Sequence, residues 1–362
     1  MAQLNIKTKI IHSNIQKLIT FLLEKNITFT LTTKVLCGHK AVLEKILTDD
    51  VVKKIHSFAD SRLSSLKVIK SLRQDAKTMY IKPPAKNMIK NVIRYADISL
   101  NSSLKTIKEL NKEAKLQNKI HEVIIMLEMG ELREGVLRND IVDFYKEVFD
   151  LSNIKVVGLG TNLGCMYGIE PTYDKLVQLS LYKQLLEEKF KRKIPYISGG
   201  SSITLPLLDK KSLPFEVNHF RIGEAAFFGV SPLQNKKFKN LSQHAFEFEA
   251  NVIELEKKES VPDGKISQAS IGHTSTHDFS GKTYRAIVDY GILDVDYKEL
   301  TPKDSQVKFF GITSDMTVYD LGKNKGSSNY PKYHVHSKIK FKPTYMAVAR
   351  LMNSKFVDKN VS

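Results

Sequence analysis

The first two thirds of the chain alternate between short apolar runs and longer amphipathic segments. Each apolar run is typical of a buried strand, and each following segment has the apolar spacing of a helix that covers a sheet. The predicted strands are residues 27–33, 55–59, 78–81, 98–100, 123–127, 154–159, 194–197 and 217–220. The clearest helical stretches between them are residues 102–117, 140–149 and 172–191.

Strands that alternate with helices pair in parallel, because each return runs through a crossover helix. Eight such units within about 210 residues have the size of a (β/α)8 TIM barrel. A doubly wound open sheet alternates too, but it usually has fewer strands, and no Gly-x-Gly-x-x-Gly follows the first strand here. We therefore predict an α/β fold in which residues 12–230 form an N-terminal barrel.

The pattern changes after Gly229. Residues 231–242 are polar and rich in lysine, and we interpret them as a linker. Residues 243–362 alternate between apolar and polar positions with period two, which predicts a mainly β C-terminal domain. Residues 1–11 contain a further strand, which could join this second domain. The clearest strands of the second domain are residues 246–255, 284–288, 307–312 and 317–321, with a helical turn near 345–351.

Composition narrows the class of protein. The chain has 362 residues, 42% of them apolar and 26% charged, as expected for a globular protein with two domains. No apolar run approaches the length of about 18 residues that a membrane span needs, and no apolar leader follows Met1. Cys37 and Cys165 are the two cysteines, which favours a reducing, cytoplasmic location over a disulfide framework.

The net charge of +17 raises the question of a nucleic-acid partner. The lysines are scattered along the chain rather than gathered in one block, and no nucleic-acid-binding motif is present. The charge therefore favours a lysine-rich surface over a nucleic-acid site. A basic interaction protein that uses the barrel as a scaffold stays open as an alternative.

The chemistry of a TIM barrel lies at the carboxyl ends of its strands, and the first predicted strand ends at Lys34. A lysine that follows a buried run is expected in a partly dry site. Desolvation there lowers the pKa of the ammonium and makes a neutral amine available for a Schiff base. A lysine at a strand end can also extend into water, and composition alone favours this second reading for Lys34.

Glycine-rich loops follow several of the other predicted strands. In residues 130–135, two glycines bracket Arg133, whose planar guanidinium suits an anionic oxygen. Residues 198–202 read Ser-Gly-Gly-Ser-Ser after the seventh strand, and residues 221–224 read Arg-Ile-Gly-Glu after the eighth. TIM barrels often bind phosphate with the loops that follow these two strands. The sequence therefore indicates an anion site at this end of the barrel.

Taken in order, these strand ends resemble the alanine racemase-like, fold-type III pyridoxal-phosphate enzymes, and most closely their alanine/ornithine racemase branch. The resemblance covers most of the chain and is densest in the barrel. It rests on an ordered series rather than on one motif. The segments are 33–38, 59–62, 96–101, 130–135, 160–165, 198–200 and 219–224, followed by 294–295, 314–315 and Tyr345.

The resemblance implies pyridoxal 5'-phosphate as cofactor and assigns the site residues. Lys34 resembles the lysine that forms the internal aldimine and serves one face of the proton transfer. Arg221 resembles the arginine that faces the pyridine nitrogen, and Arg133 resembles the arginine near the phenolic oxygen or the substrate carboxylate. Asn162 stands where alanine racemases carry a histidine. The residues that resemble contacts of the cofactor phosphate, or lie beside them, are Ser201, Ser202, Gly223 and Tyr345.

The resemblance also implies an amino-acid racemase that removes the α-proton on one face and returns it on the other. The expected substrate is ornithine-like or another small or basic amino acid. The second base would come from the β domain of a partner subunit, so a homodimer is implied. Here the chain departs from the family, because Ile292 stands where alanine racemases have a tyrosine. The candidates for the second base are Tyr290, Asp294 and Asp315.

Two alternatives follow from this departure. A cofactor-binding protein without racemase activity, in vitamin B6 homeostasis, would need Lys34 but no second base. A lyase or aldolase on the same fold usually needs a metal. His273 and His277 have the i,i+4 spacing of metal ligands, but they lie in a stretch rich in Gly, Ser and Thr that does not predict a helix. We therefore predict no metal site.

Overall fold

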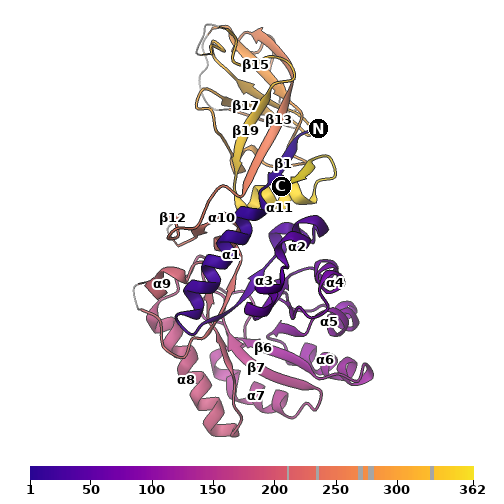
Figure 1. Ribbon diagram of the computed structural model, residues 1–362, viewed down its shortest axis with the longest axis vertical. Coiled ribbons are helices and arrows are strands. Elements are labelled where there is room, and N and C mark those ends of the chain that lie inside the picture. Colours follow the sequence, from indigo (N-terminus) through magenta and orange to yellow (C-terminus); the bar gives the residue numbers. More distant parts are fainter. Residues whose placement is uncertain (210–211, 234–235, 268–271, 276–280, 327–329) are drawn as a thin grey trace. The chain divides into compact units, whose positions relative to one another are not determined.

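The computed structural model describes residues 1–362 except 210–211, 234–235, 268–271, 276–280 and 327–329. The chain forms two compact units (Figure 1). One unit is Lys9–Gln243. The other combines Met1–Thr8 with His244–Ser362, so the N-terminal residues belong to the same unit as the C-terminal domain.

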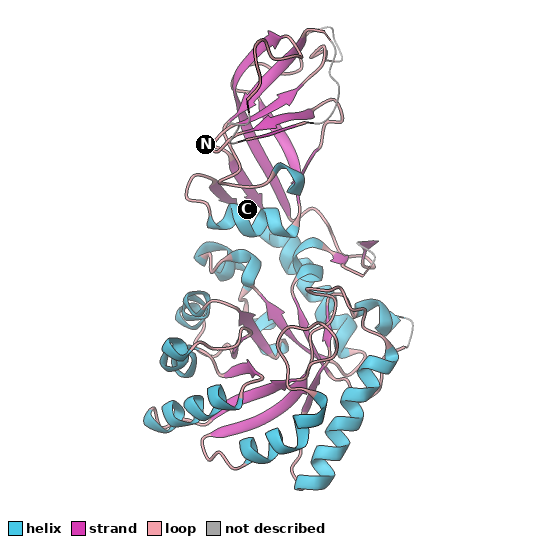
Figure 2. Cartoon of the chain, turned by 180° about the vertical axis from the view of Figure 1, so that it is seen from behind, coloured by secondary structure: helices cyan, strands magenta, loops and turns pink. Residues whose placement is uncertain are grey.

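The first unit is built on one parallel sheet whose strand order is β8-β7-β6-β5-β4-β3-β2-β10-β9. All eight strands predicted from the apolar runs are present, and helices alternate with them (Figure 2). The predicted barrel is therefore confirmed. The strands are β2 (Thr28–Thr32), β3 (Ser57–Asp60), β4 (Thr78–Tyr80), β5 (Ile98–Asn101), β6 (His121–Met126), β7 (Ile154–Gly160), β8 (Tyr196–Ser198), β9 (Gly200–Ser201) and β10 (His219–Ile222).

The barrel has a ninth strand because its seventh predicted strand is interrupted at Gly199. The part before the interruption, β8, pairs with β7, and the part after it, β9, pairs with β10. One short segment thus links the two edges of the sheet and brings the barrel close to closure. A Cβ atom on Gly200 would lie 2.1 Å from the ring of Phe220, so only glycine permits this approach.

Helices and short 3-10 turns connect the strands. The helices are α1 (Thr8–Leu23), α2 (Lys40–Ile46), α3 (Asp49–Lys54), α4 (Leu63–Leu72), α5 (Ile89–Tyr95), α6 (Leu104–Leu116), α7 (Ile141–Phe149), α8 (Tyr173–Phe190), α9 (Leu205–Asp209) and α10 (Glu224–Phe228). The 3-10 turns are η1 (Lys34–Leu36), η2 (Lys86–Met88) and η3 (Arg138–Asp140).

Two segments differ from the sequence predictions. The strand expected within residues 4–11 ends at Ile6, and α1 begins at Thr8 because the buried residues Ile11, Ile15 and Leu22 have helical spacing. Residues 231–242, expected to be a linker, belong to the barrel unit and include a hairpin of β11 (Val230–Ser231) and β12 (Lys236–Lys237). Aromatic packing attaches this segment to the barrel, since the ring centroid of Phe238 lies 5.6 Å from that of Phe21 in α1.

The second unit is mainly β, as predicted. Its sheet is antiparallel except for the pairing of β1 with β20, and the long strand β13 pairs with β1 and β19 along its first half and with β15 along its second. The strands are β1 (Gln3–Ile6), β13 (Phe246–Lys258), β14 (His273–Thr274), β15 (Thr283–Val288), β16 (Leu300–Pro302), β17 (Lys308–Ile312), β18 (Thr317–Asp320), β19 (Lys338–Pro343) and β20 (Asp358–Val361). Its helical elements are η4 (Tyr297–Glu299) and α11 (Tyr345–Asn353).

We expect Gly200→Ala to lower the free energy of unfolding by about 3 kcal/mol, because the added methyl group overlaps the Phe220 ring. Urea denaturation followed by circular dichroism measures this loss. Gly311→Ala is the control, since its Cβ would have no neighbour closer than 3.4 Å, and it should change the stability by less than about 1 kcal/mol. Equal losses in the two variants would contradict the role of Gly200 in barrel closure.

Candidate active site

The polar residues predicted from the strand ends lie at one end of the barrel, where the carboxyl ends of its parallel strands meet. Lys34 follows β2, and Arg221 lies near the end of β10. These two strands are direct neighbours, with Arg221 paired to Thr30 in the parallel register. The structure therefore brings the predicted lysine and arginine to adjacent strand ends, although 187 residues separate them in the sequence (221 − 34).

Arg221 is held by four hydrogen bonds, and only 8% of its surface is exposed. Its Nη1 atom donates to the carbonyl oxygen of Ser198 at 2.7 Å and to the hydroxyl of the same residue. Its Nη2 atom donates to the Thr161 carbonyl at 2.7 Å and to Asn162 Oδ1 at 2.8 Å. Burial lowers the pKa of the guanidinium to about 10, so it is a cation at neutral pH. Its Nε–H donor has no hydrogen-bond partner within the described part of the chain.

A carboxylate that the sequence reasoning missed links the other predicted residues to Arg221. Asn162 donates through Nδ2 to Glu134, and Glu134 also forms an ion pair with Arg133. Arg133 contacts the sulfur of Cys165 as well. The structure therefore joins Arg133, Asn162 and Arg221 into one network. Glu134 was hidden in sequence because it reads as an ordinary polar loop residue.

Two further carboxylates, both also missed, hold the loops around this network. Glu128 accepts the backbone N–H groups of Gly130 at 2.5 Å and of Leu132 and Arg133 at 3.1 Å. Glu131, 2% exposed, accepts four backbone N–H groups from the loop after β7. These donors are Cys165 at 3.0 Å, Met166 at 2.7 Å, Tyr167 at 2.9 Å and Ile169 at 2.9 Å.

The charge of Glu131 is stabilised by these loop amides. Burial alone would raise the pKa of the carboxyl, but the backbone hydrogen bonds together outweigh burial, and the net pKa is lowered. A carboxylate inside a glycine-bracketed loop is a sequence signal for this arrangement, because such a loop exposes backbone donors that need acceptors.

Lys34 begins η1 directly after β2. Val35 and Leu36 are fully buried and anchor the turn, whereas the Lys34 side chain is exposed. The expectation of a partly dry lysine is therefore wrong for the single chain, because the turn directs its two apolar residues inward and leaves the lysine at the open end. The Lys34 charge acts on half-buried Glu224, where burial raises the carboxyl pKa and the lysine opposes that rise.

Asp60, which belongs to the 59–62 segment of the resemblance but was assigned no role there, ends β3 beside the lysine turn. Its side chain is 1% exposed, accepts the backbone N–H of Arg62 at 2.9 Å and receives a long hydrogen bond of 3.4 Å from the Thr33 hydroxyl. Burial is the dominant effect and raises the pKa of this carboxyl to about 6, against the hydrogen bonds that lower it. The Asp60 carboxyl, with its pKa of about 6, thus contacts Thr33, the residue that directly precedes Lys34.

The candidate phosphate contacts of the barrel lie at the ends of β9 and β10. Ser202 is buried and accepts the backbone N–H of Ala225 at 3.1 Å, and the N–H of Ser201 donates to Thr204 Oγ1 at 3.1 Å. Gly223 lies close to β2, since a Cβ there would be 3.1 Å from the Thr32 carbonyl. Tyr345 begins α11 in the other unit, so its role toward this site stays a prediction.

The candidates for the second base lie in two turns of the β unit that contact each other. The N–H of Ile292 donates to the Thr313 carbonyl at 3.0 Å, and that of Leu293 donates to the Ser314 carbonyl at 3.1 Å. These bonds place Asp294 and Asp315 on neighbouring turns. Gly291 is required here, because a Cβ would lie 2.3 Å from the opposing backbone.

The three candidates differ in their surroundings. Tyr290 is fully buried and its hydroxyl contacts that of Tyr319 at 2.5 Å, so it is not available as a base. Asp294 accepts the Ser354 hydroxyl at 2.7 Å, which ties it to the end of α11. Asp315 is exposed, and its hydrogen bond comes from its neighbour Ser314 at 3.1 Å.

Neither a metal centre nor a membrane span stands out in the residues that the structure describes. His273 lies exposed in β14, while His277 is outside the described residues. Among the described residues, no group of three or more His, Cys, Asp and Glu side chains is arranged to hold a metal ion. No described helix is both long enough and apolar enough to cross a bilayer.

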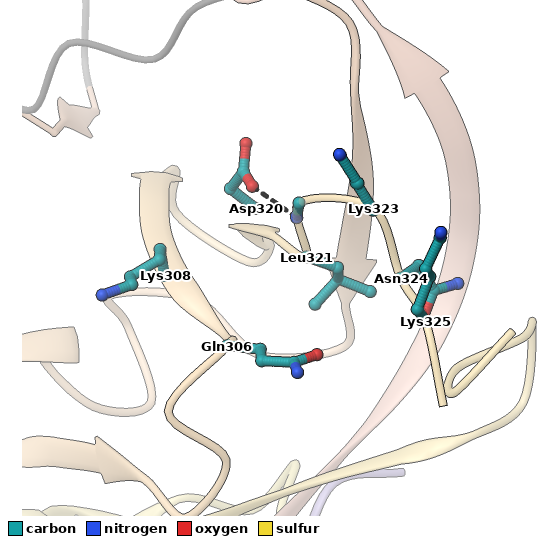
Figure 3. A pocket seen from close by; sticks show the side chains of 8 residues that line it. Gln306, Lys308, Asp320, Leu321, Lys323, Asn324 and Lys325 are labelled. Carbon is teal, nitrogen blue, oxygen red and sulfur yellow. Dashed lines mark hydrogen bonds between the residues drawn. The ribbon is translucent and has the colours of Figure 1, made fainter. Parts of the chain in front are cut away.

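A cavity of about 610 Å³ lies in the β unit and is lined by Gln306, Lys308, Asp320, Leu321, Gly322, Lys323, Asn324 and Lys325 (Figure 3). Its lysines do not converge, since Lys308 points away from Lys323 and Lys325 (Figure 3). The Asp320 carboxylate accepts the Gly322 N–H at 2.6 Å and forms a buried ion pair with Arg285. The lysines of this cavity therefore do not converge on one point, unlike the Arg133, Asn162 and Arg221 network of the barrel.

A parallel barrel with a lysine after its first strand and a buried arginine near the end of its last defines an enzyme class that works at the carboxyl ends of the strands. Residues 6–232 match the alanine racemase N-terminal domain family. The chain belongs to this family.

Two relatives extend the match to most of the chain. The ornithine racemase of Acetoanaerobium sticklandii is 34% identical over 318 residues, which cover 86% of this chain and 88% of the relative. The lysine racemase of Thermotoga maritima is 30% identical over 360 residues, which cover 99% of this chain and 97% of the relative. Both are racemases, isomerases that act on amino acids, and the prediction of an enzyme of this kind is confirmed.

Solved structures agree in fold. The alanine racemase of Clostridium difficile superposes with a TM-score of 0.74 at 16% identity, covering 100% of this chain and 95% of that one. D-threonine aldolase from Filomicrobium marinum superposes with a TM-score of 0.69 at 14% identity, covering 98% and 88%. At such low identities these similarities describe the architecture alone.

Asp60 makes stability depend on pH. Its pKa in the folded chain, about 6, lies above the ordinary 3.8, so ionisation lowers the free energy of unfolding progressively as pH rises through that window. Asp60→Asn removes this effect. We expect the stability of the variant relative to wild type to increase by about 2 to 3 kcal/mol between pH 4 and pH 7.5, measured by urea denaturation. A pH-independent difference between the two proteins would contradict this prediction.

Glu131→Gln is expected to release the loop of residues 165–169, because an amide has only one acceptor oxygen and turns an N–H₂ group toward the loop donors. Loss of charged hydrogen bonds worth about 3 kcal/mol raises amide exchange in this segment about 100-fold, as measured by hydrogen–deuterium exchange mass spectrometry. Glu170→Gln, at an exposed position of the same loop, is the control and should leave exchange unchanged. Similar exchange in both variants would show that Glu131 does not hold the loop.

Proposed function

We propose that this chain is a pyridoxal 5'-phosphate-dependent racemase that acts on a basic amino acid of the ornithine and lysine type. The observation that carries the proposal is the placement of Lys34 and Arg221 on the adjacent ends of β2 and β10. A primary amine and a buried guanidinium, both at the open end of a barrel, are the two groups that the reaction needs most.

The residues present fit the cofactor. Lys34 supplies an exposed amine that can bond to an aldehyde, and the Nε–H of Arg221 lacks a partner within the described part of the chain and can face a ring nitrogen. Ser202 and Gly223 lie next to this pair and would hold the phosphate. When bound, the cofactor supplies an electron sink that acidifies Cα of an amino acid.

Arg221 would control the reaction type. A guanidinium cannot accept a proton, so a ring nitrogen that it faces stays unprotonated. An unprotonated ring is a weaker electron sink, which favours simple proton removal and return at Cα over other bond cleavages. The four hydrogen bonds that hold Arg221 keep the guanidinium in place and charged.

The proton on the face opposite Lys34 would be handled by Asp315 of the partner subunit in a homodimer. Asp315 is the candidate whose carboxylate is exposed, whereas Tyr290 is buried and Asp294 is bound to Ser354. Leu293, 81% exposed, and Met316, 40% exposed, flank this cluster, and such apolar side chains support a subunit interface there. The homodimer that the family resemblance implies supports a partner subunit at this position.

A cofactor-binding protein without turnover is the second candidate function. The burial of Tyr290 and the presence of Ile292 favour it, since the chain lacks a tyrosine where alanine racemases have their second base. The two functions share the cofactor site and differ only in proton exchange at Cα.

Lys34→Ala should abolish both the absorbance band of the lysine-bound cofactor and deuterium exchange at Cα. The experiment incubates purified protein and pyridoxal phosphate with ornithine or lysine in heavy water, and NMR follows the loss of the Cα proton. Lys40→Ala, at a nearby exposed lysine, should keep both signals. Exchange that survives in Lys34→Ala would defeat the proposal, and cofactor binding without exchange in the wild type would establish the second candidate.

A further inference from the structure

A chain of hydrogen bonds runs from Arg221 into the interior of the barrel. The hydroxyl of Ser198, which accepts from Arg221, lies 2.8 Å from Nδ1 of His219. On the other side of the ring, His219 Nε2 lies 2.9 Å from the Thr30 hydroxyl. Ser198, His219 and Thr30 are fully buried and come from the three strands β8, β10 and β2. The arginine is thus backed by a second layer of side chains.

The chain continues to the strand on the far side of β2. The Thr30 hydroxyl lies 2.7 Å from the hydroxyl of Ser57, which lies 3.2 Å from Nδ1 of His56. The ring of His56 packs edge-on against the ring of His219, with the two centroids 4.9 Å apart. The ring of Tyr196 is tilted to that of His219, with the centroids 5.6 Å apart. His219 is therefore held by ring packing as well as by hydrogen bonds at both nitrogens.

The contacts of Ser198 select the direction of the bonds in this chain. A guanidinium can only donate, so the Ser198 oxygen accepts from it, and among the described residues Nδ1 of His219 is the one acceptor in contact with the Ser198 hydroxyl that can take its buried proton. Nδ1 is then an acceptor, and the single ring proton is on Nε2, which donates to Thr30. The Thr30 proton in turn points to Ser57. His219 is therefore a neutral imidazole in its Nε2–H form.

Electrostatics favour the same state. Burial lowers the pKa of His219 well below its ordinary value, and the charges of His56 and Arg221 lower it further. A protonated ring would put a second cation behind Arg221 and would turn a donor toward the Ser198 oxygen that the arginine occupies. The acceptor at Nδ1 is thus the feature of His219 that the arginine depends on.

We propose that His219 is a positioning residue that, through Ser198, holds the Arg221 guanidinium where it faces the cofactor ring. This inference rests on the proposed function, because it assigns the ring as the group that Arg221 meets. His219 touches neither cofactor nor substrate. Its contribution is to give the Ser198 proton an acceptor, so that the Ser198 oxygen stays turned toward the guanidinium.

Two amide substitutions separate the nitrogens of His219. In His219→Asn the side-chain oxygen can take the place of Nδ1, which preserves the acceptor for Ser198 and loses the donor to Thr30. In His219→Gln the amide reaches the place of Nε2, which preserves the donor to Thr30 and loses the acceptor. Both variants lose ring packing and one hydrogen bond, so both should lose similar stability. The comparison therefore isolates the bond toward Arg221.

The experiment measures the dissociation constant of pyridoxal phosphate by absorbance titration, together with kcat, KM and the free energy of unfolding, for the full chain and both variants. We expect His219→Gln to weaken cofactor binding about tenfold and to lower kcat about tenfold while KM changes less than about twofold, since one buried hydrogen bond is lost. His219→Asn should stay within about threefold of wild type in both quantities. Ser198→Ala should weaken cofactor binding as much as His219→Gln does.

Equal cofactor affinities in the two amide variants, or a Ser198→Ala variant that binds the cofactor as wild type does, would overturn the assignment. If a variant does not fold, the remaining variant and Ser198→Ala still decide the result. Failure of the proposed function has a different signature, because the wild-type chain would then bind no cofactor through Lys34. Cofactor binding by the wild type with no difference among the variants would refute only the role of His219.

Discussion

The site is organised around one buried cation. Arg221 has lost most of its water, and an unpaired charge in such a place would destabilise the fold by several kcal/mol. Its four hydrogen bonds go to acceptors on β8 and on the segment after β7, so the guanidinium joins three neighbouring parts of the barrel. The same bonds that stabilise the charge also position it. The remaining donor is thereby left for a ligand at the open end of the barrel.

In the surrounding loops, carboxylates accept backbone N–H groups and so hold the loops in place. Glu128 and Glu131 accept seven backbone N–H groups between them, three and four respectively, and so give the glycine-rich loops a defined course without regular secondary structure. Glu134 joins these loops to the Arg221 network through Asn162. These carboxylates therefore fix the backbone of the loops that surround the Arg221 network.

The two units contribute unequally to the proposed chemistry. The barrel holds the amine, the guanidinium and the candidate phosphate contacts Ser201, Ser202 and Gly223 within one compact body, whereas Tyr345 belongs to the other unit. The β unit holds the exposed Asp315 and the apolar side chains beside it, while its tyrosine at position 290 is buried in an aromatic core with Phe248 and Phe341. In the mechanism that we propose, a partner subunit serves one face of the reaction, and this face is where the sequence departs from alanine racemases through Ile292.

The sequence by itself determined the architecture and predicted the main site residues. Apolar runs alternating with helical segments determine a parallel barrel because each strand is buried on both faces. The strand ends, taken in order, resemble a family, and that resemblance predicts roles for Lys34, Arg133, Asn162 and Arg221. Only the tertiary structure decided which acceptors complete these residues. Glu131 and His219 read in sequence as a loop carboxylate and a strand histidine, because the donors that they meet are 34 or more residues away or lie on another strand. Closure of the barrel brings these partners together, and a local sequence pattern cannot predict which distant residues will meet.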